Sequence, residues 1–325
     1  MVSFAAKGRL EWFKVLLMLM RHRVRSRIYP GSWSIHGAPL ILSHPSQIDR
    51  LVQADRPGLW VLGEQAAHAL SYPDQASGEC NAIEDISYWF QHRNASIAAL
   101  LKSKVSDGLV LDVGGGNGST TRHMLDAGLD CWLIEPSAEG CWNACQRGVP
   151  TVIMGTLEEI ALPSHSVAAV GLFDVIEHID DVGSLLREVK RVLRPGGHVA
   201  ITVPALPWLW SSEDVYAGHF RRYTKHRLKR SLSDLGFTVD LSEYFFGPLV
   251  LPLFAGRVIP SKMGLRKGGD WTKAAKEHGA DEGWMSSIVR RLLNREQRRM
   301  EAGRWPMLGT SCFGLARCGK GEVDA

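Results

Sequence analysis

The fold is decided by one stretch, Val110-Leu111-Asp112-Val113-Gly114-Gly115-Gly116-Asn117-Gly118. Its first four residues predict a short buried strand, and the segment that begins at Ser119 predicts a helix. Glycines between a strand and a helix let the chain turn tightly and let a ligand approach the backbone, while the first N–H groups of the helix stay unpaired. The stretch therefore predicts a site for a nucleotide-like ligand.

The spacing of the glycines separates two kinds of cofactor. The dinucleotide pattern Gly-x-Gly-x-x-Gly would place its third glycine at Ser119, but here that glycine is Gly118. Asp112, just before the glycines, is unsuited to a pyrophosphate and suited to a cationic or amino-bearing ligand. An oxidoreductase with a nucleotide cofactor is therefore the less favoured alternative, and a glycine turn without a ligand is another.

A carboxylate closes the next predicted strand. Glu135 lies about 20 residues after the glycines, where a carboxylate can accept hydrogen bonds from both hydroxyls of a ribose. The alternative is a negative charge that merely stabilises the start of the next helix. Combined with the glycine turn, the position of Glu135 indicates an adenosine.

The rest of the chain from about residue 95 alternates short apolar runs with amphipathic stretches, which is typical of βαβ units. Helical spacing predicts a helix that Pro195-Gly196-Gly197 stops, and a second helix from the N-cap Thr224 to Gly236. The fold class is therefore α/β, with a doubly wound, mostly parallel sheet. The predicted strands are Leu109–Val113, Cys131–Glu135, Thr151–Met154, Ala168–Phe173, His198–Val203, Phe237–Leu241 and Ser311–Ala316.

The domain organisation follows from the same pattern. Residues 1–80 are repeatedly broken by proline, so we expect an N-terminal extension there and one domain over residues 81–325. The last two strands are much further apart than a usual connection requires, which predicts an insert at about residues 245–308. This insert begins with an apolar stretch, Tyr244–Ile259, and ends with a basic helix, Met285–Arg299.

Four blocks of the chain, in this order, resemble the class I S-adenosylmethionine-dependent methyltransferases of the small-molecule type. The blocks are Val110–Gly118, Glu135, Phe173–Ile179 and Leu193–Gly197. The resemblance implies a Rossmann-like sheet of seven strands that ends in an antiparallel pair, with S-adenosyl-L-methionine as the cofactor. It places Thr156 and Leu157 beside the adenine and Asp112 near the methionine amino group. The residues expected at the cofactor are Asp112, Gly114, Gly116, Gly118, Glu135, Thr156, Leu157 and Asp174.

The expected chemistry is methyl transfer. A sulfonium donor is already activated, so the protein must hold donor and nucleophile in line, and a hydroxyl nucleophile also needs a base. The candidate bases are His178 and His219; the alternative for His178 is a histidine bonded to backbone at a helix start. Asp174, Glu177 and His178 resemble a magnesium site of some quinone-biosynthesis methyltransferases. We assign no metal, because the pattern is common among relatives not known to use one.

Two further blocks, Glu84–Asn94 and Trp208–Thr224, resemble segments of bacterial methyltransferases of surface-glycan and lipid-linked sugar pathways. Aromatic residues mixed with arginine suit stacking on a ring and binding an anionic group; the alternative is an aromatic hinge that packs on the core while the arginines face solvent. We therefore expect O-methylation of a small-molecule or lipid-linked saccharide acceptor; a non-catalytic module that keeps the cofactor fold is a further alternative. The residues expected at the acceptor are Trp89, Arg93, Trp210, Arg221, Arg222 and Tyr223.

Composition limits the partners. The 325 residues carry a net charge of +4 that is spread along the chain, so we expect no nucleic-acid partner. No run approaches the roughly 20 apolar residues of a membrane span, no Cys-x-x-Cys pair suggests zinc, and we expect a cytoplasmic protein. The segment Leu10–Arg27 and the insert combine apolar residues with arginines. Each is expected either to pack on the protein or to contact a membrane peripherally.

Overall fold

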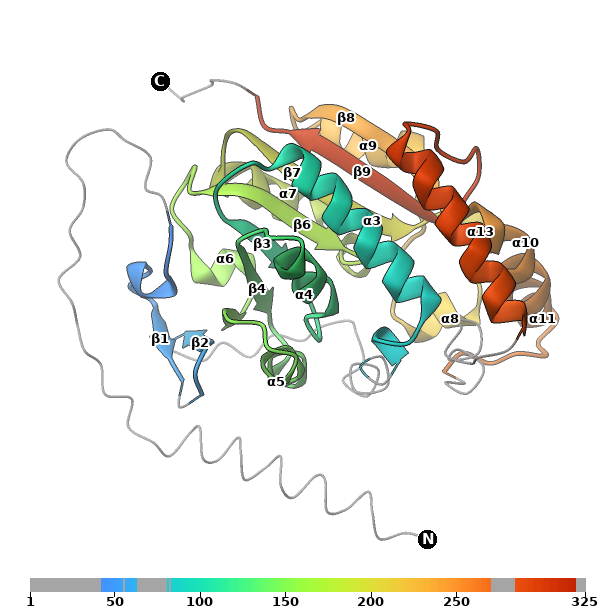
Figure 1. Ribbon diagram of the computed structural model, residues 1–325, viewed down its shortest axis with the longest axis horizontal. Coiled ribbons are helices and arrows are strands. Elements are labelled where there is room, and N and C mark those ends of the chain that lie inside the picture. Colours follow the sequence, from blue (N-terminus) through green and yellow to red (C-terminus); the bar gives the residue numbers. More distant parts are fainter. Residues whose placement is uncertain (1–41, 55, 63–80, 82, 270–283, 320–325) are drawn as a thin grey trace, which may run out of the picture.

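The computed structural model describes residues 42–54, 56–62, 81, 83–269 and 284–319. Within them lies one nine-stranded sheet in the order β1-β2-β5-β4-β3-β6-β7-β9-β8 (Figure 1). The strands are β1 (Leu51–Gln53), β2 (Leu59–Leu62), β3 (Val110–Val113), β4 (Cys131–Glu135), β5 (Val152–Met154), β6 (Val167–Phe173), β7 (Leu193–Pro204), β8 (Thr238–Phe245) and β9 (Ser311–Arg317).

The central strands β2, β5, β4, β3, β6 and β7 run parallel, and their carboxyl ends therefore meet at one edge. Strand β9 pairs antiparallel with both β7 and β8, which gives the antiparallel end that the family resemblance implied. Strands β3, β4 and β6 are buried along their whole length. Such continuous burial explains why their sequences are apolar runs without alternation.

Helices cover both faces of the sheet, as the hydrophobic faces of a parallel sheet require (Figure 1). One face is packed by α3, α4, α5 and α13, and the other by α6, α7 and α9. The helices are α3 (Tyr88–Lys104), α4 (Ser119–Asp126), α5 (Ala138–Gln146), α6 (Leu157–Ile160), α7 (Val182–Val192), α8 (Ser212–Tyr216), α9 (Lys225–Ser233), α10 (Val250–Leu253), α11 (Ile259–Lys262) and α13 (Trp284–Glu301).

The predicted fold class is confirmed, and all seven predicted strands are present, but the sheet is larger than expected. Strand β2 pairs with β5, and β1 pairs antiparallel with β2, so part of the expected N-terminal extension belongs to the sheet. Residues 1–41, which include the segment Leu10–Arg27, lie outside the described residues. Strands of three and four residues with weak alternation carry too little pattern to be recognised in a sequence.

The ends of α7 and α9 agree with the predictions only in part. The predicted N-cap Thr224 is confirmed, because its side chain accepts a hydrogen bond from the backbone N–H of Arg227. Helix α7 already ends at Val192, and Pro195-Gly196-Gly197 lies inside β7 rather than in a turn. Gly236 follows the end of α9 with a φ of 79°, the left-handed conformation that glycine adopts readily.

The chain between β8 and β9 contains short helices followed by α13. Gly247–Leu249 forms a 3₁₀ turn, α10 and α11 flank a π-helical turn over Phe254–Val258, and α13 lies beside α3 (Figure 1). Glu296 of α13 is buried and accepts backbone hydrogen bonds from Phe246 at 2.7 Å and Gly247 at 2.8 Å. Within the described residues, none of the helices has the length and apolar character needed to cross a bilayer.

Candidate active site

The glycine turn lies between β3 and α4, at the carboxyl edge of the sheet. Gly114, Gly116 and Gly118 all have positive φ, and Gly118 is the N-cap of α4. A Cβ on Gly114 would lie 2.8 Å from Val175, but one on Gly116 would have no protein atom within 4 Å. The first glycine is therefore required by packing, whereas Gly116 borders open space where a ligand can approach the backbone.

Gly118 is a glycine for two reasons that involve no ligand. Its φ of 77° favours glycine, and a Cβ there would lie 2.9 Å from both Ala144 and Val149. The side chain of Leu157 is likewise part of the hydrophobic core, although we expected it beside the adenine. Thr156 caps α6 at the end of β5. Of these three residues, only Thr156 is partly exposed, and it remains a predicted cofactor contact.

Glu135 joins the glycine turn to the end of β4. Its Oε2 accepts a hydrogen bond from the backbone N–H of Gly116 at 2.9 Å, and its Oε1 accepts one from Ser137 at 2.8 Å. Burial, opposed by these two hydrogen bonds, raises the pKa of Glu135 to about 7. The carboxylate is thus held beside the open position at Gly116, and Glu135 remains the predicted ribose ligand.

Asp112 lies beneath the glycine turn. It is fully buried, and its Oδ2 accepts a hydrogen bond of 2.6 Å from the Thr121 hydroxyl of α4. Its Oδ1 has no hydrogen-bond partner among the described residues, and burial raises the pKa of Asp112 to about 6. Asp112 therefore anchors the start of α4 and keeps one oxygen available for a donor.

Replacement of Glu135 by glutamine is expected to weaken S-adenosylhomocysteine binding by about 1–3 kcal/mol, because the ribose hydroxyls lose an anionic acceptor. In the wild type, affinity is also expected to fall as the pH decreases from 8 to 6, since the ionised form of Glu135 is lost through a pKa of about 7. Calorimetry over this pH range measures both effects. The control is Glu158→Gln, an exposed carboxylate on α6; equal affinities for the two variants would contradict the assignment.

Arg93 and Asp174 form an ion pair at the carboxyl end of β6. Asp174 directly follows β6 with a φ of 59°, and its carboxylate lies 2.6 Å from Nε of Arg93. The buried Arg93 guanidinium also donates to the Phe173 carbonyl and to the Thr120 hydroxyl, both at 2.8 Å. We expected Arg93 at the acceptor. The structure instead uses it to tie α3 and α4 to the end of β6.

A buried ion cluster lies opposite this strand end. Asp214 of α8 accepts hydrogen bonds from Nε of Arg222 at 2.7 Å and from Nδ1 of His219 at 3.0 Å. Burial alone would raise the pKa of Asp214, but the hydrogen bond from His219 and the charge of Arg222 hold it well below its usual range. The anionic carboxylate therefore orients the His219 ring.

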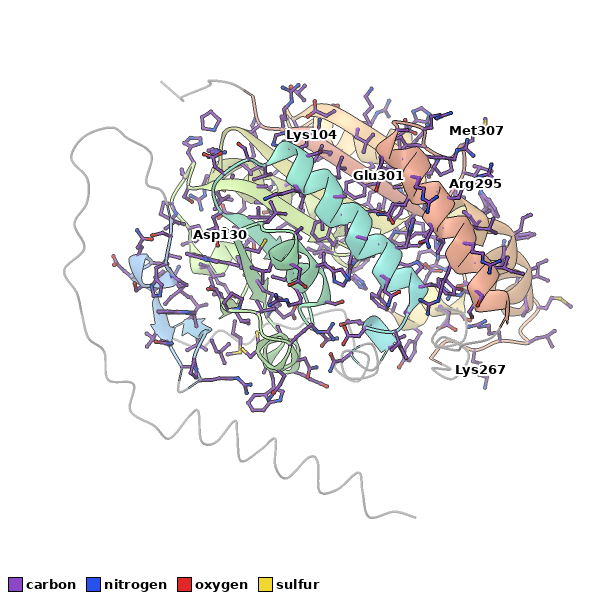
Figure 2. The ribbon with its side chains drawn as sticks, in the orientation of Figure 1. Lys104, Asp130, Lys267, Arg295, Glu301 and Met307 are labelled. Atoms are coloured by element: carbon purple, nitrogen blue, oxygen red, sulfur yellow. The ribbon has the colours of Figure 1, made fainter. Side chains whose placement is uncertain are left out.

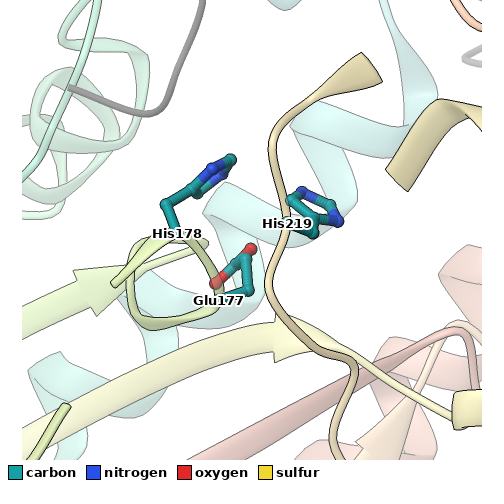
Figure 3. Close-up of side chains that lie close together, drawn as sticks. All are labelled: Glu177, His178 and His219. Carbon is teal, nitrogen blue, oxygen red and sulfur yellow. The ribbon is translucent and has the colours of Figure 1, made fainter. Parts of the chain in front are cut away.

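The two histidines expected to be catalytic face each other. The rings of His178 and His219 lie 4.7 Å apart in an edge-to-face arrangement, with Glu177 beside them (Figure 3). Burial and the neighbouring His219 lower the pKa of His178 to about 3, so this imidazole stays neutral at physiological pH. Burial and the charge of Asp174 raise the pKa of Glu177 well above its usual range. Sequence reasoning proposed both histidines but could not show that they meet.

The residues expected at the acceptor fall into two groups. Arg222 and Tyr223 are buried and bonded to protein groups, so the burial of Tyr223 fits a hinge packed on the core, whereas Arg222 does not face solvent as that alternative expected. Trp89, Trp210 and Arg221 are partly exposed. Trp89 stacks on Phe246 of the insert at 5.3 Å. These three remain predicted acceptor residues.

Asp214 is the residue of the candidate site that sequence reasoning missed. Its signal was Ser211-x-x-Asp214, a capping box in which the Asp214 carboxylate accepts a hydrogen bond from the Ser211 backbone N–H at 2.9 Å. That pattern predicts a helix start, but it does not predict that the carboxylate also binds Arg222 and His219. Those contacts require the loop after α8 to fold back over the helix.

Comparison with known proteins shows what part of the chain is similar to. Residues 84–242 match the family of methyltransferase domains. These residues, which make up about half of the chain, are similar to S-adenosylmethionine-dependent methyltransferases. The matched methyltransferase domain contains the glycine turn, Glu135 and both histidines.

Relatives of the methyltransferase domain share only part of their length with it. An uncharacterized methyltransferase of Mycobacterium bovis is 34% identical over 114 residues, covering 34% of this chain and 43% of the relative. A Mycobacterium tuberculosis protein named a probable S-adenosylmethionine-dependent methyltransferase is 34% identical over 166 residues, covering 50% of this chain and 60% of the relative. The chain therefore spans less than two thirds of the length of these curated relatives.

A solved structure extends the likeness in fold. A chain from the complex between the Haloferax volcanii Trm112 methyltransferase activator and a methyltransferase superposes with a TM-score of 0.51 at 16% sequence identity. The match covers 77% of this chain and 96% of that chain. It supports the same fold for the methyltransferase domain beyond the segment that the family model matches.

Proposed function

We propose that the protein transfers a methyl group from S-adenosyl-L-methionine to an oxygen atom of a small-molecule or lipid-linked saccharide acceptor. The observation that carries this proposal is the Asp214–His219 pair, at 3.0 Å, opposite the strand end that follows the cofactor site. An imidazole whose Nδ1 is held by a carboxylate keeps Nε2 as a proton acceptor. Such a group serves a hydroxyl nucleophile, which has a proton to lose.

The proposed reaction uses the groups described above. The acceptor oxygen attacks the methyl carbon, a carbon–oxygen bond forms, and the carbon–sulfur bond breaks to leave neutral S-adenosylhomocysteine. The hydroxyl proton passes to Nε2 of His219, and the charge of Asp214 stabilises the resulting imidazolium. His178 cannot hold this proton near neutral pH, because its pKa is about 3. We expect His178 to contact the acceptor as a neutral imidazole instead.

Two measurements test the proposed function. In a thermal-shift experiment, S-adenosylhomocysteine is expected to stabilise the protein and NAD is not, which separates a methyltransferase from a nucleotide-cofactor oxidoreductase. Incubation with methyl-labelled cofactor and a panel of saccharide acceptors then tests turnover, with mass spectrometry locating the methylated atom. Cofactor binding without turnover on any acceptor would favour a non-catalytic module, and methylation at nitrogen or carbon would contradict the oxygen acceptor.

A peripheral membrane contact is part of this proposal, since a lipid-linked acceptor lies at a membrane. Helix α13 exposes Ile288 and Leu292, at 46% and 45%, on the face that also carries Arg295 and Arg299. Figure 2 shows Lys267, Arg295 and Met307 at the end of the molecule formed by α10, α11 and α13. Exposed apolar residues among cations suit the surface of an anionic bilayer.

Flotation with anionic vesicles is expected to recover the intact protein at low salt and to lose it at high salt, because surface charges are screened. The double variant Arg295→Ala/Arg299→Ala should bind about 2 kcal/mol more weakly, at about 1 kcal/mol per cation. The control is Arg230→Ala on α9, an exposed arginine outside the insert. Equal flotation of both variants, or no binding at low salt, would contradict the contact and favour a soluble acceptor.

A further inference from the structure

Three side chains next to the proposed acceptor site bring metal-ligating atoms together. One carboxylate oxygen of Glu177 and one ring nitrogen each of His178 and His219 lie within 4.8 Å of one another (Figure 3). Glu177 is only 1% exposed, and its Oε2 has no hydrogen-bond partner among the described residues. A buried carboxylate oxygen without a partner is costly, and a cation would remove that cost. We propose that Glu177, His178 and His219 bind one divalent transition-metal ion.

The donor set indicates which ions fit. Two imidazoles and one carboxylate suit Zn²⁺, Mn²⁺, Fe²⁺ or Co²⁺, whereas Mg²⁺ and Ca²⁺ prefer sites made of oxygen ligands. Three protein ligands also leave coordination positions for water or an acceptor oxygen. The proposed site is therefore a transition-metal site with coordination positions left for other ligands.

The hydrogen bonds that hold the His219 ring also support a metal site. Asp214 accepts a hydrogen bond from Nδ1 of His219, which leaves Nε2 as the nitrogen available to an ion. A carboxylate behind a histidine is the usual arrangement that fixes the ring of a metal ligand. In turn, Arg222 and the Ser211 backbone hold Asp214 in place.

The ligand set differs from the one that the sequence suggested. Asp174 was the third member of the sequence pattern with Glu177 and His178, but its carboxylate lies 2.6 Å from Nε of Arg93. That ion pair occupies Asp174. His219, from the loop after α8, takes the third position instead, and no local sequence pattern links it to Glu177.

The proposed function gives the ion a role, and this part of the inference rests on it. A bound divalent ion would contact the acceptor hydroxyl and lower its pKa, so that the proton leaves to water and the oxygen attacks the methyl carbon. In the metal-loaded protein, His219 would bind the ion and would no longer accept the proton of the acceptor hydroxyl. The ion would then activate this hydroxyl in place of His219. Binding of the ion itself does not depend on this role.

Metal binding is tested on the full chain, treated with a chelator and without cofactor or acceptor. Titration with Co²⁺, followed by visible absorption, and calorimetry with Zn²⁺ should both show one ion per chain. Zn²⁺ should bind at least about 100-fold more tightly than Mg²⁺. His219→Ala and Glu177→Gln should each lose at least about 100-fold in Zn²⁺ affinity, and Asp214→Asn about 10- to 100-fold.

The control is His226→Ala, an exposed histidine on α9, which should bind the ion like the wild type. Circular dichroism confirms that each variant is folded, and Glu177→Gln keeps the shape of the neutral acid. Wild-type affinity no better than that of His219→Ala would overturn the metal site. S-adenosylhomocysteine binding, measured on the same samples, separates failure of the proposed function from failure of the metal site. If S-adenosylhomocysteine does not bind, the proposed function is contradicted. If it binds but no metal ion does, only the metal site is contradicted.

Discussion

Replacement of Asp214 by alanine is expected to lower the free energy of unfolding by about 3–5 kcal/mol. The substitution leaves the Arg222 guanidinium, whose side chain is 5% exposed, without its carboxylate. It also removes the hydrogen bonds to His219 and to the Ser211 backbone. Removing one partner of a buried ion pair costs far more than the pair itself contributes, because the other charge stays buried.

Urea unfolding of the wild type and Asp214→Ala measures this loss. The control is Asp180→Ala, which removes the 86% exposed partner of Arg221 and should cost about 0–1 kcal/mol. A loss below about 1 kcal/mol for Asp214→Ala would contradict the role of the cluster.

The pH dependence of stability gives an independent check. The pKa of Asp214 is depressed in the folded protein, so its contribution is present above the ordinary carboxyl pKa of about 4 and is lost as the pH falls below it. Asp214→Asn should therefore lose less stability than the wild type between pH 5 and pH 3.

Replacement of His219 by alanine is expected to lower the rate of methyl transfer by about 10²- to 10⁴-fold. Its affinity for S-adenosylhomocysteine should stay within about twofold, because His219 belongs to the loop after α8 and not to the glycine turn. Single-turnover assays and calorimetry on the same protein measure the two quantities.

His226→Ala is the matched control and should keep both properties. A rate within tenfold of the wild type for His219→Ala would rule out a role in activating the acceptor. A parallel loss of cofactor affinity would instead show that the substitution disturbs the cofactor edge of the sheet.

The cofactor half of the site follows largely from local sequence. Glycines after an apolar run predict a strand, a turn and a helix, and the next strand end then places Glu135 beside Gly116, where the hydrogen bond is 2.9 Å. This works because adjacent parallel strands bring their carboxyl ends together. The spacing of Glu135 from the glycines is thus enough to predict that the two segments lie side by side.

The acceptor half of the site could not be predicted from local sequence in the same way. Arg93, Arg222 and Tyr223 were expected at the acceptor, yet all three are buried in protein contacts. Arginine and tyrosine suit both ligand binding and burial in an ion pair or core. Residue type therefore cannot decide between the two, because the decision depends on which elements pack above each side chain.

By itself, the sequence determined the α/β class, which segments form the central strands, and the positions of the glycine turn and Glu135 along the chain, because strand and helix periodicities are local properties. Only the tertiary structure decided that β1 and β2 join the sheet, that Arg93 holds Asp174, and that His219 meets His178. Each of these contacts joins segments far apart in the chain. Their formation depends on burial and charge pairing in the packed protein, which no local pattern encodes.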